Sequence, residues 1–499
     1  MNESAGRPQQ FLPLWLLQGV TLYWIALKLG ALFIGEPHAD EAYYWFWGQH
    51  LALSYFDHPG LHAWLQAGAA ALFGWSLFAL RFLSIVTTAI TLYILYLWAR
   101  RLAPAQWKPY FWLSAALFYS TPTMLLYTTV AILDRLLVAL ILLTIHFFAW
   151  FLADWSEGKR DRYLALYLGA FFLGLAALTK YTGALPGIAV AIAILLRSDL
   201  RSLLRTPHLY LAAALGVAMQ FPTLYWNLTE YSASFAFHLE GGLAGVDGID
   251  EGLRRLLRVL IESLVLVSPF AVVAMGVFLV RRAGQGFFGV LHDVARWTFI
   301  VSTLTVIALA FIRDALFYWN IPAYAAFFGL AAWFMRSRVA QVLQFVYGAL
   351  ISTLLLVHFS IMPILPYVGL SQPDSNGFFG WQKIAAETQV AMGEQGADFP
   401  ASASWGIGSR LGFAMQRPDV LPISINVNAF NYWVDNADYL GKDAVVVTEA
   451  EEDHLLSNVA RYFATLEPLK TIEIERFGQK LKTYRLSLGR DYRVPEGAP

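Results

Sequence analysis

The sequence contains no cysteine and little charge. Without cysteine, the chain has no disulfides, no thiolate chemistry and no cysteine-ligated zinc or iron–sulfur sites. Only 14% of its 499 residues are Asp, Glu, Lys or Arg, whereas 58% are hydrophobic. An average soluble protein has about 25% charged residues, so a globular surface of this size could not be covered. Most of the chain must therefore face membrane lipids.

The few charges that are present cancel. There are 35 basic and 35 acidic residues, which removes the electrostatic argument for nucleic acid as a partner. Aromatic residues make up 16% of the chain. Their amphipathic rings favour the headgroup level of a bilayer, which is typical of a protein with many membrane crossings.

Eleven apolar stretches could cross a hydrocarbon core about 30 Å thick, although some are short for it. Two nearly continuous runs are divided at Asp134/Arg135 and at Lys180, where charge interrupts them. The predicted spans cover residues 11–33, 78–99, 109–127, 132–152, 163–179, 181–196, 208–226, 256–280, 296–312, 317–335 and 339–357. The sequence thus predicts an α-helical polytopic membrane protein with about eleven transmembrane helices.

Basic residues in the loops predict the orientation. Alternate loops are rich in Lys and Arg, as at Arg100-Arg101 and Lys159-Arg160, whereas the segment 34–77 has none. By the positive-inside rule, the N-terminus is then cytoplasmic and the C-terminus extracytoplasmic. We expect residues 1–365 to form the membrane domain, with 34–77 as its first outer loop. Residues 366–499 have a soluble composition, with strand-like runs at 444–448, 471–475 and 482–486 and helical stretches around 384–392 and 451–466. They predict a small extracytoplasmic α/β domain.

The first outer loop carries the most informative acids. Asp40, Glu41, Asp57 and His58 lie among aromatic residues without a basic neighbour in the loop. Such carboxylates are costly at a membrane surface unless they bind something, so they mark a candidate site. The alternative is that Asp40 and Glu41 stabilise the start of the helix that follows. Residues 61–75 are apolar but short, and favour a helix lying in the interface.

Three more charged residues stand at the outer ends of predicted spans. Asp134 begins the fourth span, Lys180 interrupts an apolar run, and Arg313 precedes an aromatic stretch. Lys180 is a candidate for binding an anion at the membrane surface, and snorkelling to the interface is its alternative. Asp134 and Arg313 could instead form local ion pairs with Arg135 and Asp314.

The order of these motifs resembles a known family. It is similar to the protein O-mannosyltransferase and aminoarabinose-transferase-like family, which are bacterial polyprenyl-phosphate-dependent glycosyltransferases of the GT-C class. The resemblance covers residues 11 to about 360. It rests on Asp40-Glu41-Ala42-Tyr43-Tyr44-Trp45, Tyr55-Phe56-Asp57-His58-Pro59, Leu133-Asp134, Leu178-Thr179-Lys180-Tyr181-Thr182 and Trp319-Asn320-Ile321-Pro322, with Phe379-Gly380-Trp381 and Asn431-Tyr432-Trp433 as landmarks of an appended periplasmic domain.

The resemblance implies roles for the site residues. Asp40 would be the catalytic acid of the first periplasmic loop, with Asp134 as the second acidic position of the active site and Glu41 as a further catalytic candidate. Lys180 would lie beside the lipid phosphate, with Arg313 and His58 as further candidates for binding it. A divalent metal is the one cofactor that the resemblance brings in, and Asp57 and His58 are its candidate ligands. The location implied is the bacterial inner membrane.

The chemistry is consistent with these residue types. A sugar linked through C1 to a lipid phosphate has a leaving group already stabilised as an anion, so one base and one cation suffice. A direct displacement then predicts inversion at C1. We expect a polyprenyl-phosphate-sugar donor and a lipid, glycan or protein acceptor. The alternative is a transporter or flippase of polyprenyl-linked sugars, which would place ionisable residues near the bilayer midplane rather than in outer loops.

Overall fold

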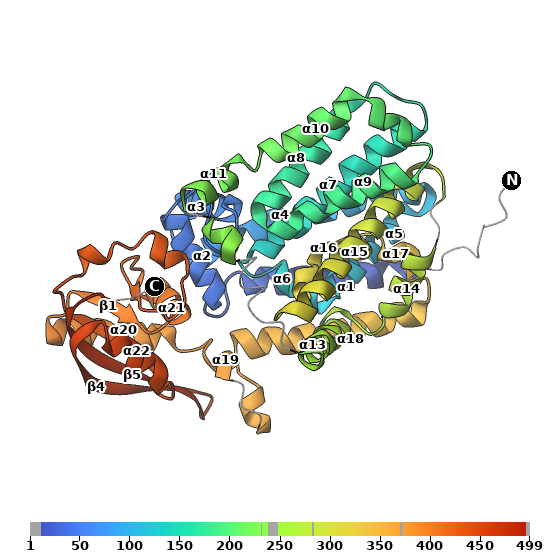
Figure 1. Ribbon diagram of the computed structural model, residues 1–499. Helices are drawn as coiled ribbons and strands as arrows, with labels where there is room; N and C mark the ends of the chain where they lie inside the picture. The colour runs from blue at the N-terminus through green and yellow to red at the C-terminus, as the bar shows by residue number, and fades with distance from the viewer. Residues whose placement is uncertain (1–10, 231, 238–247, 282–283, 370–372, 496–499) are drawn as a thin grey trace. The chain divides into compact units, whose positions relative to one another are not determined.

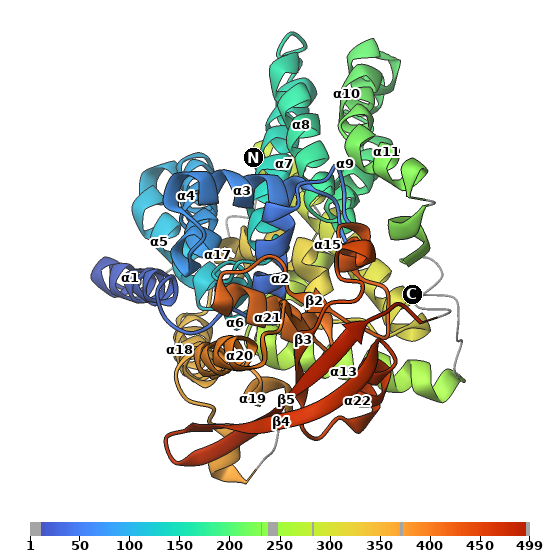
Figure 2. The same ribbon diagram turned by 90° about the vertical axis from the view of Figure 1, so that its left-hand side faces the viewer.

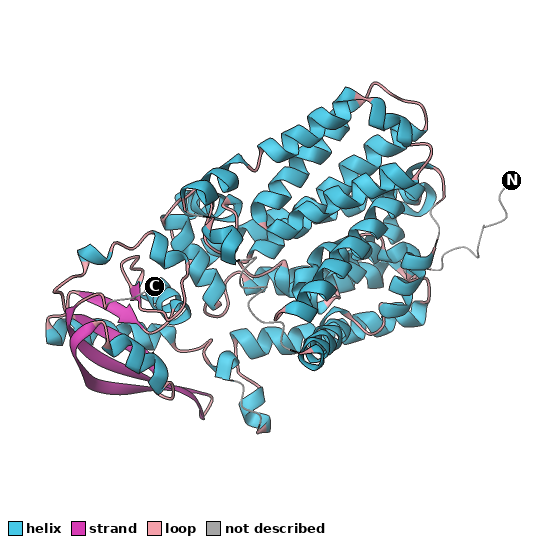
Figure 3. Cartoon of the chain, in the orientation of Figure 1, coloured by secondary structure: helices cyan, strands magenta, loops and turns pink. Residues whose placement is uncertain are grey.

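The computed structural model describes residues 11–230, 232–237, 248–281, 284–369 and 373–495. Contacts divide the chain into two compact units. The first comprises Met1–Gly30, His58–Leu61 and Leu83–Thr353, and the second comprises Ala31–Asp57, His62–Phe82 and Leu354–Pro499. Helices occur along the whole described chain, whereas the strands of its sheet all lie in the C-terminal segment (Figure 3).

Helices of very different lengths build the first unit (Figure 1). They are α1 (Leu14–Ala31), α4 (Leu77–Leu102), α5 (Trp107–Tyr119), α6 (Pro122–Tyr127), α7 (Leu133–Ser156), α8 (Tyr163–Thr179), α9 (Leu185–Leu196), α10 (Pro207–Ala218), α11 (Phe221–Thr229), α13 (Ile249–Val267), α14 (Val272–Val280), α15 (Gly286–Ile312), α16 (Ile321–Phe328), α17 (Ala331–Phe334) and α18 (Arg338–Ser360). Several begin with proline in their first turn. Backbone N–H groups in that turn have no partner within the helix, so the missing N–H of proline costs no hydrogen bond there.

Helix α7 is the centre of this unit. It packs against α8, α15 and α16 and is buried along most of its length. In the other helices that are long enough to span a bilayer, fewer than half of the residues are buried, and their apolar composition suits contact with lipid. Asp134 and Arg135 lie in the first turn of α7, so this buried helix carries ionisable groups. Such groups inside a membrane bundle mark a functional site by default.

The protein is a multi-pass membrane protein. Among the described residues, five helices are long and apolar enough to cross a bilayer, or up to seven if each of two bent pairs is one span. Each of the eleven predicted stretches is helical, and the breaks expected near Asp134 and Lys180 are present. Helices α8 and α9 are shorter than a full span, so the count of eleven crossings stays a prediction.

Two predicted spans are bent rather than continuous. The stretch 208–226 bends by 44° between α10 and α11, and the stretch 256–280 bends by 106° between α13 and α14. At the second break, Ser268 Oγ accepts the N–H groups of Phe270 (3.1 Å) and Ala271 (3.3 Å). A hydroxyl that satisfies backbone donors at the start of α14 stabilises an interruption that hydrophobicity alone does not reveal.

The second unit combines the predicted first loop with the C-terminal segment (Figure 2). Its helices are α2 (Ala39–Gln49), α3 (Leu61–Phe73), α19 (Pro373–Asn376), α20 (Trp381–Gln395), α21 (Trp405–Met415) and α22 (Asp453–Ala460). Its strands are β1 (Phe399–Ser402), β2 (Leu421–Pro422), β3 (Ala444–Glu449), β4 (Phe463–Arg476) and β5 (Gln479–Tyr492). They form one sheet in the order β2-β1-β3-β5-β4, parallel from β2 to β3 and antiparallel from β3 to β4.

The small α/β domain predicted after the membrane helices is therefore confirmed as a sheet with helices. The strands expected at 444–448, 471–475 and 482–486 lie within β3, β4 and β5. The helix expected over 451–466 is wrong in its second half, because α22 ends at Ala460 and Phe463 begins β4. The predicted domain limits at 365 and at 34–77 stay a prediction.

Aromatic residues join the loop helix α2 to the C-terminal helix α21. Phe46 lies so close to Gly412 that a Cβ there would be 2.3 Å from its ring, so only glycine fits. The same ring meets Phe430 edge to face at 4.8 Å. Aromatic pairs of this geometry add stability beyond their buried area. The acids of α2 are thus positioned by residues more than 350 positions further along the chain.

Candidate active site

Asp40 lies in the first turn of α2, and His38 rather than Asp40 caps that helix. Nδ1 of His38 accepts the backbone N–H of Asp40 (3.1 Å) and is also 3.2 Å from Oδ2 of Asp40. These two contacts alternate, because an unprotonated Nδ1 accepts the backbone N–H, whereas a protonated Nδ1 donates to the carboxylate instead. The capping role considered for Asp40 is therefore taken by its neighbour, and the Asp40 side chain remains 36% exposed.

The surroundings of Asp40 keep its carboxyl ionised. Burial opposes the charge, but the hydrogen bond and charge of His38 outweigh it, and Arg410 of α21 adds to them. Together they lower the pKa of Asp40 below its ordinary value. A carboxylate that is partly exposed and fully ionised at neutral pH can accept a proton from a bound hydroxyl.

Asp57 lies in a different environment. The hydroxyl of Tyr43 donates to Oδ2 of Asp57 (2.8 Å) and itself accepts the N–H of Ala429 (2.7 Å), which ties the loop to the C-terminal segment. Burial raises the pKa of Asp57 to about 6, and the nearby charge of Asp40 acts in the same direction. Two carboxyls with pKa values pushed apart are typical of sites that divide acid and base roles.

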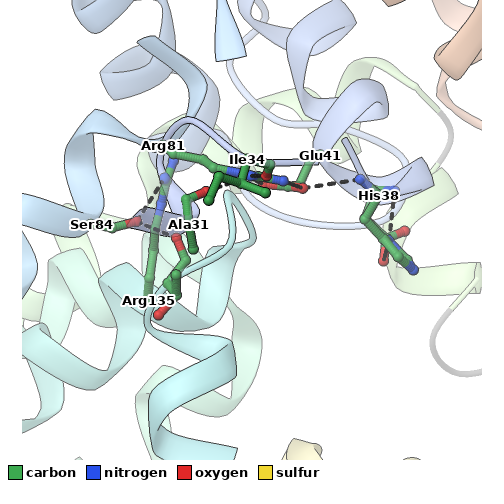
Figure 4. Close-up of polar contacts among 9 residues, drawn as sticks. Ala31, Ile34, His38, Glu41, Arg81, Ser84 and Arg135 are labelled. Carbon is green, nitrogen blue, oxygen red and sulfur yellow. Dashed lines mark hydrogen bonds and ion pairs between the residues drawn. The ribbon is translucent and has the colours of Figure 1, made fainter. Parts of the chain in front are cut away.

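Glu41 has a structural environment instead. Its Oε2 accepts the N–H of His38 (3.0 Å), and both its oxygens accept hydrogen bonds from Arg81, at 2.8 and 2.7 Å (Figure 4). Arg81 also donates to the carbonyl oxygens of Ala31 and Ile34. The Glu41 side chain is 1% exposed. A buried, bidentate pair that closes a capping box favours the helix-stabilising role considered for Glu41 over a catalytic one.

Asp134 and Lys180 form a buried ion pair in the first unit. Nζ of Lys180 donates to Oδ1 (2.9 Å) and Oδ2 (3.2 Å) of Asp134, and both side chains are less than 10% exposed. The ammonium also lies 5.2 Å from the centre of the Tyr318 ring. Asp134 thus pairs with Lys180, 46 residues along the chain, in addition to lying next to Arg135 in sequence.

A close turn holds Lys180 in this place. Helix α8 ends at Thr179, and Lys180 is extended before the short helix η2 (Tyr181–Ala184) turns back. A Cβ at Gly183 would lie 2.1 Å from the carbonyl oxygen of Ala176, so the turn packs directly on α8 and requires glycine there. The charge is therefore fixed by backbone geometry rather than carried on a mobile loop.

Two further cations are buried near the same end of the first unit. Nζ of Lys28 donates to the carbonyl and hydroxyl oxygens of Thr128 and to the hydroxyl of Thr129. Arg135 donates to Oγ of Ser84 at 3.3 Å (Figure 4). Hydroxyl and carbonyl oxygens thus take part in holding both charges.

Arg313 lies beside an aromatic ring. The carboxylate of Asp314 pairs with Arg258 (2.7 Å), and the guanidinium of Arg313 lies 5.4 Å from the centre of the Trp319 ring. The local pair considered between Arg313 and Asp314 stays a prediction. A guanidinium on an indole face still has donors in its plane, so its predicted role in phosphate binding remains chemically open to it.

The predicted metal site lacks a ligand set. Among the described residues, no three His, Asp or Glu side chains are grouped so that they could hold a metal ion. Asp57 has Tyr43 as a partner of one oxygen, and His58 belongs to the other compact unit. The residues present do not fit a bound divalent metal, and no step below depends on one.

Three comparisons with known proteins agree on one class. The family described as dolichyl-phosphate-mannose-protein mannosyltransferase matches residues 57–226. Lipid A galacturonosyltransferase RgtD from Rhizobium johnstonii is 27% identical over 297 residues, which are 59% of this chain and 60% of that relative. Crystal structures of ArnT from Cupriavidus metallidurans, apo and bound to undecaprenyl phosphate, cover 95% and 94% of the chain and 98% of their own, with 15% and 14% identity and TM-scores of 0.60 and 0.59.

The chain is similar to GT-C glycosyltransferases in part of its sequence and in its fold. These similarities agree with the resemblance drawn from the motifs, and the ArnT structures share the fold of this chain beyond the matched family segment. Of the predicted site residues, the structure groups Asp40 and Asp57 in one unit, and pairs Asp134 with Lys180 in the other.

Sequence reasoning missed Tyr43 and Arg410 as parts of the site. Tyr43 belongs to an aromatic motif, and nothing in that motif indicates that its hydroxyl donates a hydrogen bond to Asp57. Arg410 lies in a segment of ordinary soluble composition, about 370 residues from Asp40. The landmark Phe379-Gly380-Trp381 was the available signal, because Glu36 of the first loop accepts the N–H groups of Gly380 (3.2 Å) and Trp381 (2.8 Å).

Proposed function

We propose that the protein transfers a sugar from a polyprenyl-phosphate-sugar donor to an acceptor at the extracytoplasmic face of the inner membrane. The acceptor oxygen attacks C1 of the sugar while the bond from C1 to the phosphate oxygen breaks. The acceptor's proton passes to a carboxylate, and the polyprenyl phosphate leaves as an anion. A single displacement of this kind inverts the configuration at C1.

The observation that carries the proposal is the Asp40 carboxylate. It is held ionised by His38 and Arg410, yet more than a third of its side chain is exposed. A purely structural acid on a helix of buried aromatics would be paired and covered, as Glu41 is. Asp40 is therefore the proposed general base, which typically contributes about 10²–10⁴-fold to the rate.

The Asp134–Lys180 pair supports a role in holding the donor. The related ArnT structure is named as bound to undecaprenyl phosphate, so a lipid phosphate is the donor group that we propose here. Lys180 offers a compact positive charge for it, with Arg313 and His58 as further candidates. A phosphate that approaches Lys180 must share it with Asp134, and this competition would help the phosphate to leave after transfer.

The acceptor is proposed from the relative's name. RgtD is named a lipid A galacturonosyltransferase, so lipid A or another lipid-linked glycan is the first acceptor to test, with a hydroxyl or phosphate as the receiving group. A transporter is not favoured, because the matched family and relative are glycosyltransferases.

The test uses purified protein with a panel of undecaprenyl-phosphate sugars and lipid A. We expect release of undecaprenyl phosphate together with a lipid A product of increased mass and inverted anomeric configuration. If no donor in the panel releases undecaprenyl phosphate, the transferase proposal is contradicted. Movement of the intact donor across the membrane of vesicles would support the transporter.

The proposed orientation has its own test. A reporter that is active only in the cytoplasm, fused after Pro499, should be silent, since the basic loops predict an outer C-terminus. The same reporter fused into the basic loop at Lys159-Arg160 is the control and should be active. Activity after Pro499 would move the site to the wrong face of the membrane.

A further inference from the structure

Arg410 has an unusual environment for a partly buried arginine. It lies on α21, which packs against α20, and its guanidinium is 5.2 Å from the centre of the Phe378 ring and 5.6 Å from that of Trp381. Phe378 is also in contact with His38, at 4.9 Å between ring centres. One aromatic ring therefore connects Arg410 to the residue that pairs with Asp40.

The guanidinium makes no hydrogen bond to any residue that the structure describes. Its Nε is buried without a partner. Stacking on aromatic rings uses the faces of the guanidinium and leaves the N–H donors in its plane able to bind an acceptor. A buried donor without an acceptor is costly, so its retention points to an acceptor that comes from outside the chain.

The acids around Arg410 already have partners of their own. Asp40 pairs with His38, both oxygens of Glu36 accept the N–H groups at the start of α20, and Glu449 pairs with Lys482. These carboxylates act on Arg410 through charge alone among the described contacts. Nearby carboxylates therefore offset the positive charge of Arg410, but none of them is hydrogen-bonded to its guanidinium.

A structural role for Arg410 explains less of this arrangement. Its alkyl stem and ring stacking would stabilise the packing of α21 on α20, as many arginine stems do. The comparison within the same unit is Arg476, which lies 4.9 Å from the centre of the Phe379 ring but also donates from Nε to the carbonyl oxygen of Ile361. Arg476 shows that a stacked arginine here can satisfy its donors internally, and Arg410 does not.

We propose that Arg410 binds an oxyanion of a substrate beside Asp40. The group is a carboxylate or a phosphate, because both accept two parallel hydrogen bonds from the planar guanidinium. The sources are the carboxylate of an acidic sugar on the donor, the donor's lipid phosphate, or a phosphate of the acceptor. The inference rests on the proposed transfer reaction and adds a residue that selects among its substrates.

The experiment compares wild type, Arg410→Gln and Arg410→Lys with four substrates. The donors are undecaprenyl phosphate linked to galactose or to galacturonate, and the acceptors are lipid A and enzymatically dephosphorylated lipid A. Arg417→Gln is the control, since Arg417 is a C-terminal-segment arginine that pairs with Asp419. Folding is compared by thermal unfolding and by elution in detergent.

We expect Arg410→Gln to raise KM about ten- to hundredfold for the substrate that carries the bound oxyanion, as for a lost charge-assisted hydrogen bond. Arg410→Lys should recover part of this loss, and Arg417→Gln should behave as wild type. A rise only with galacturonate identifies the sugar carboxylate, a rise only with phosphorylated lipid A identifies the acceptor, and an equal rise with both donors identifies the lipid phosphate.

Unchanged KM values for all substrates would overturn the proposal, even if kcat falls, because Arg410 would then act only through Asp40. Binding of methyl galacturonoside, methyl galactoside and glycerol phosphate to wild type and Arg410→Gln gives a readout that needs no turnover. The proposal would also be overturned if neither anion bound wild type more tightly than the neutral sugar does. Tighter anion binding to wild type that is lost in Arg410→Gln would support the oxyanion site even if no transfer occurred, so the two proposals fail separately.

Discussion

Replacing Asp40 with Asn tests the centre of the proposed mechanism. Asn has the same shape but cannot take up the acceptor's proton. We expect kcat/KM to fall about 10²–10⁴-fold, which corresponds to a barrier higher by about 2.7–5.4 kcal/mol. The loss should appear mainly in kcat, because Asp40 acts on the transition state rather than on the binding of the donor's lipid.

The structure predicts a small effect of the same change on stability. Asp40 is not the helix cap, its pairing with His38 is partly exposed, and its charge lies in the first turn of α2. Exposed ion pairs and charges near a helix dipole each contribute about 1 kcal/mol or less. Thermal unfolding of Asp40→Asn should therefore stay close to wild type while transfer is lost.

Sugar transfer and thermal unfolding are measured on the same sample. Asp453→Asn is the matched control, because Asp453 is an exposed acid in the first turn of α22. It should keep both activity and stability. Transfer by Asp40→Asn within a few-fold of wild type would refute the general-base assignment, and a large loss of stability in this variant would show that the carboxylate is mainly structural.

Three further predictions follow from the other charged groups. Because burial raises the pKa of Asp57 to about 6, an essential Asp57 carboxylate would be protonated below that pH, so kcat/KM should fall as pH drops through 6; a profile flat to pH 5 would show that its charge is not needed. Lys180→Met combined with Asp134→Asn removes both buried charges, should remain folded, and should weaken undecaprenyl phosphate binding more than tenfold in equilibrium titration; unchanged affinity would make the pair structural. Glu41→Gln leaves the charge of Arg81 buried and should lower the free energy of unfolding by about 3–5 kcal/mol, and a change below 1 kcal/mol in chemical denaturation would contradict the ion pair's structural role.

The sequence was informative wherever a charge stood in an apolar setting. Asp134 and Lys180 interrupt hydrophobic runs, so each was recognisable as a group needing a partner, although the partnership between them was not. Their 46-residue separation carries no periodic signal, and only the packing of α8 against α7 brings them together. The two residues that each seemed to need an external ligand or solvent turn out to neutralise one another.

The sequence pattern also predicted where helices lie better than it predicted how they bend. Hydrophobicity predicts the apolar part of α13 and α14 from residue 256 on, but not the first turns of α13 or the 106° bend, at which the hydroxyl of Ser268 accepts two backbone donors. In the C-terminal segment, strand-like runs indicated parts of β3, β4 and β5, whereas β1 and β2 have four and two residues and are too short to show a period.

Arg410 shows why charge in a soluble segment is harder to interpret than charge in a membrane span. An arginine among apolar spans is conspicuous, because lipid offers it no water, whereas the C-terminal segment contains several arginines with nothing to rank them. Arg410 becomes distinctive only in the folded chain, where its guanidinium lies near the Phe378 and Trp381 rings and its Nε is buried without an acceptor. The property that assigns it a ligand is thus an unmet hydrogen bond, which exists only in the folded chain.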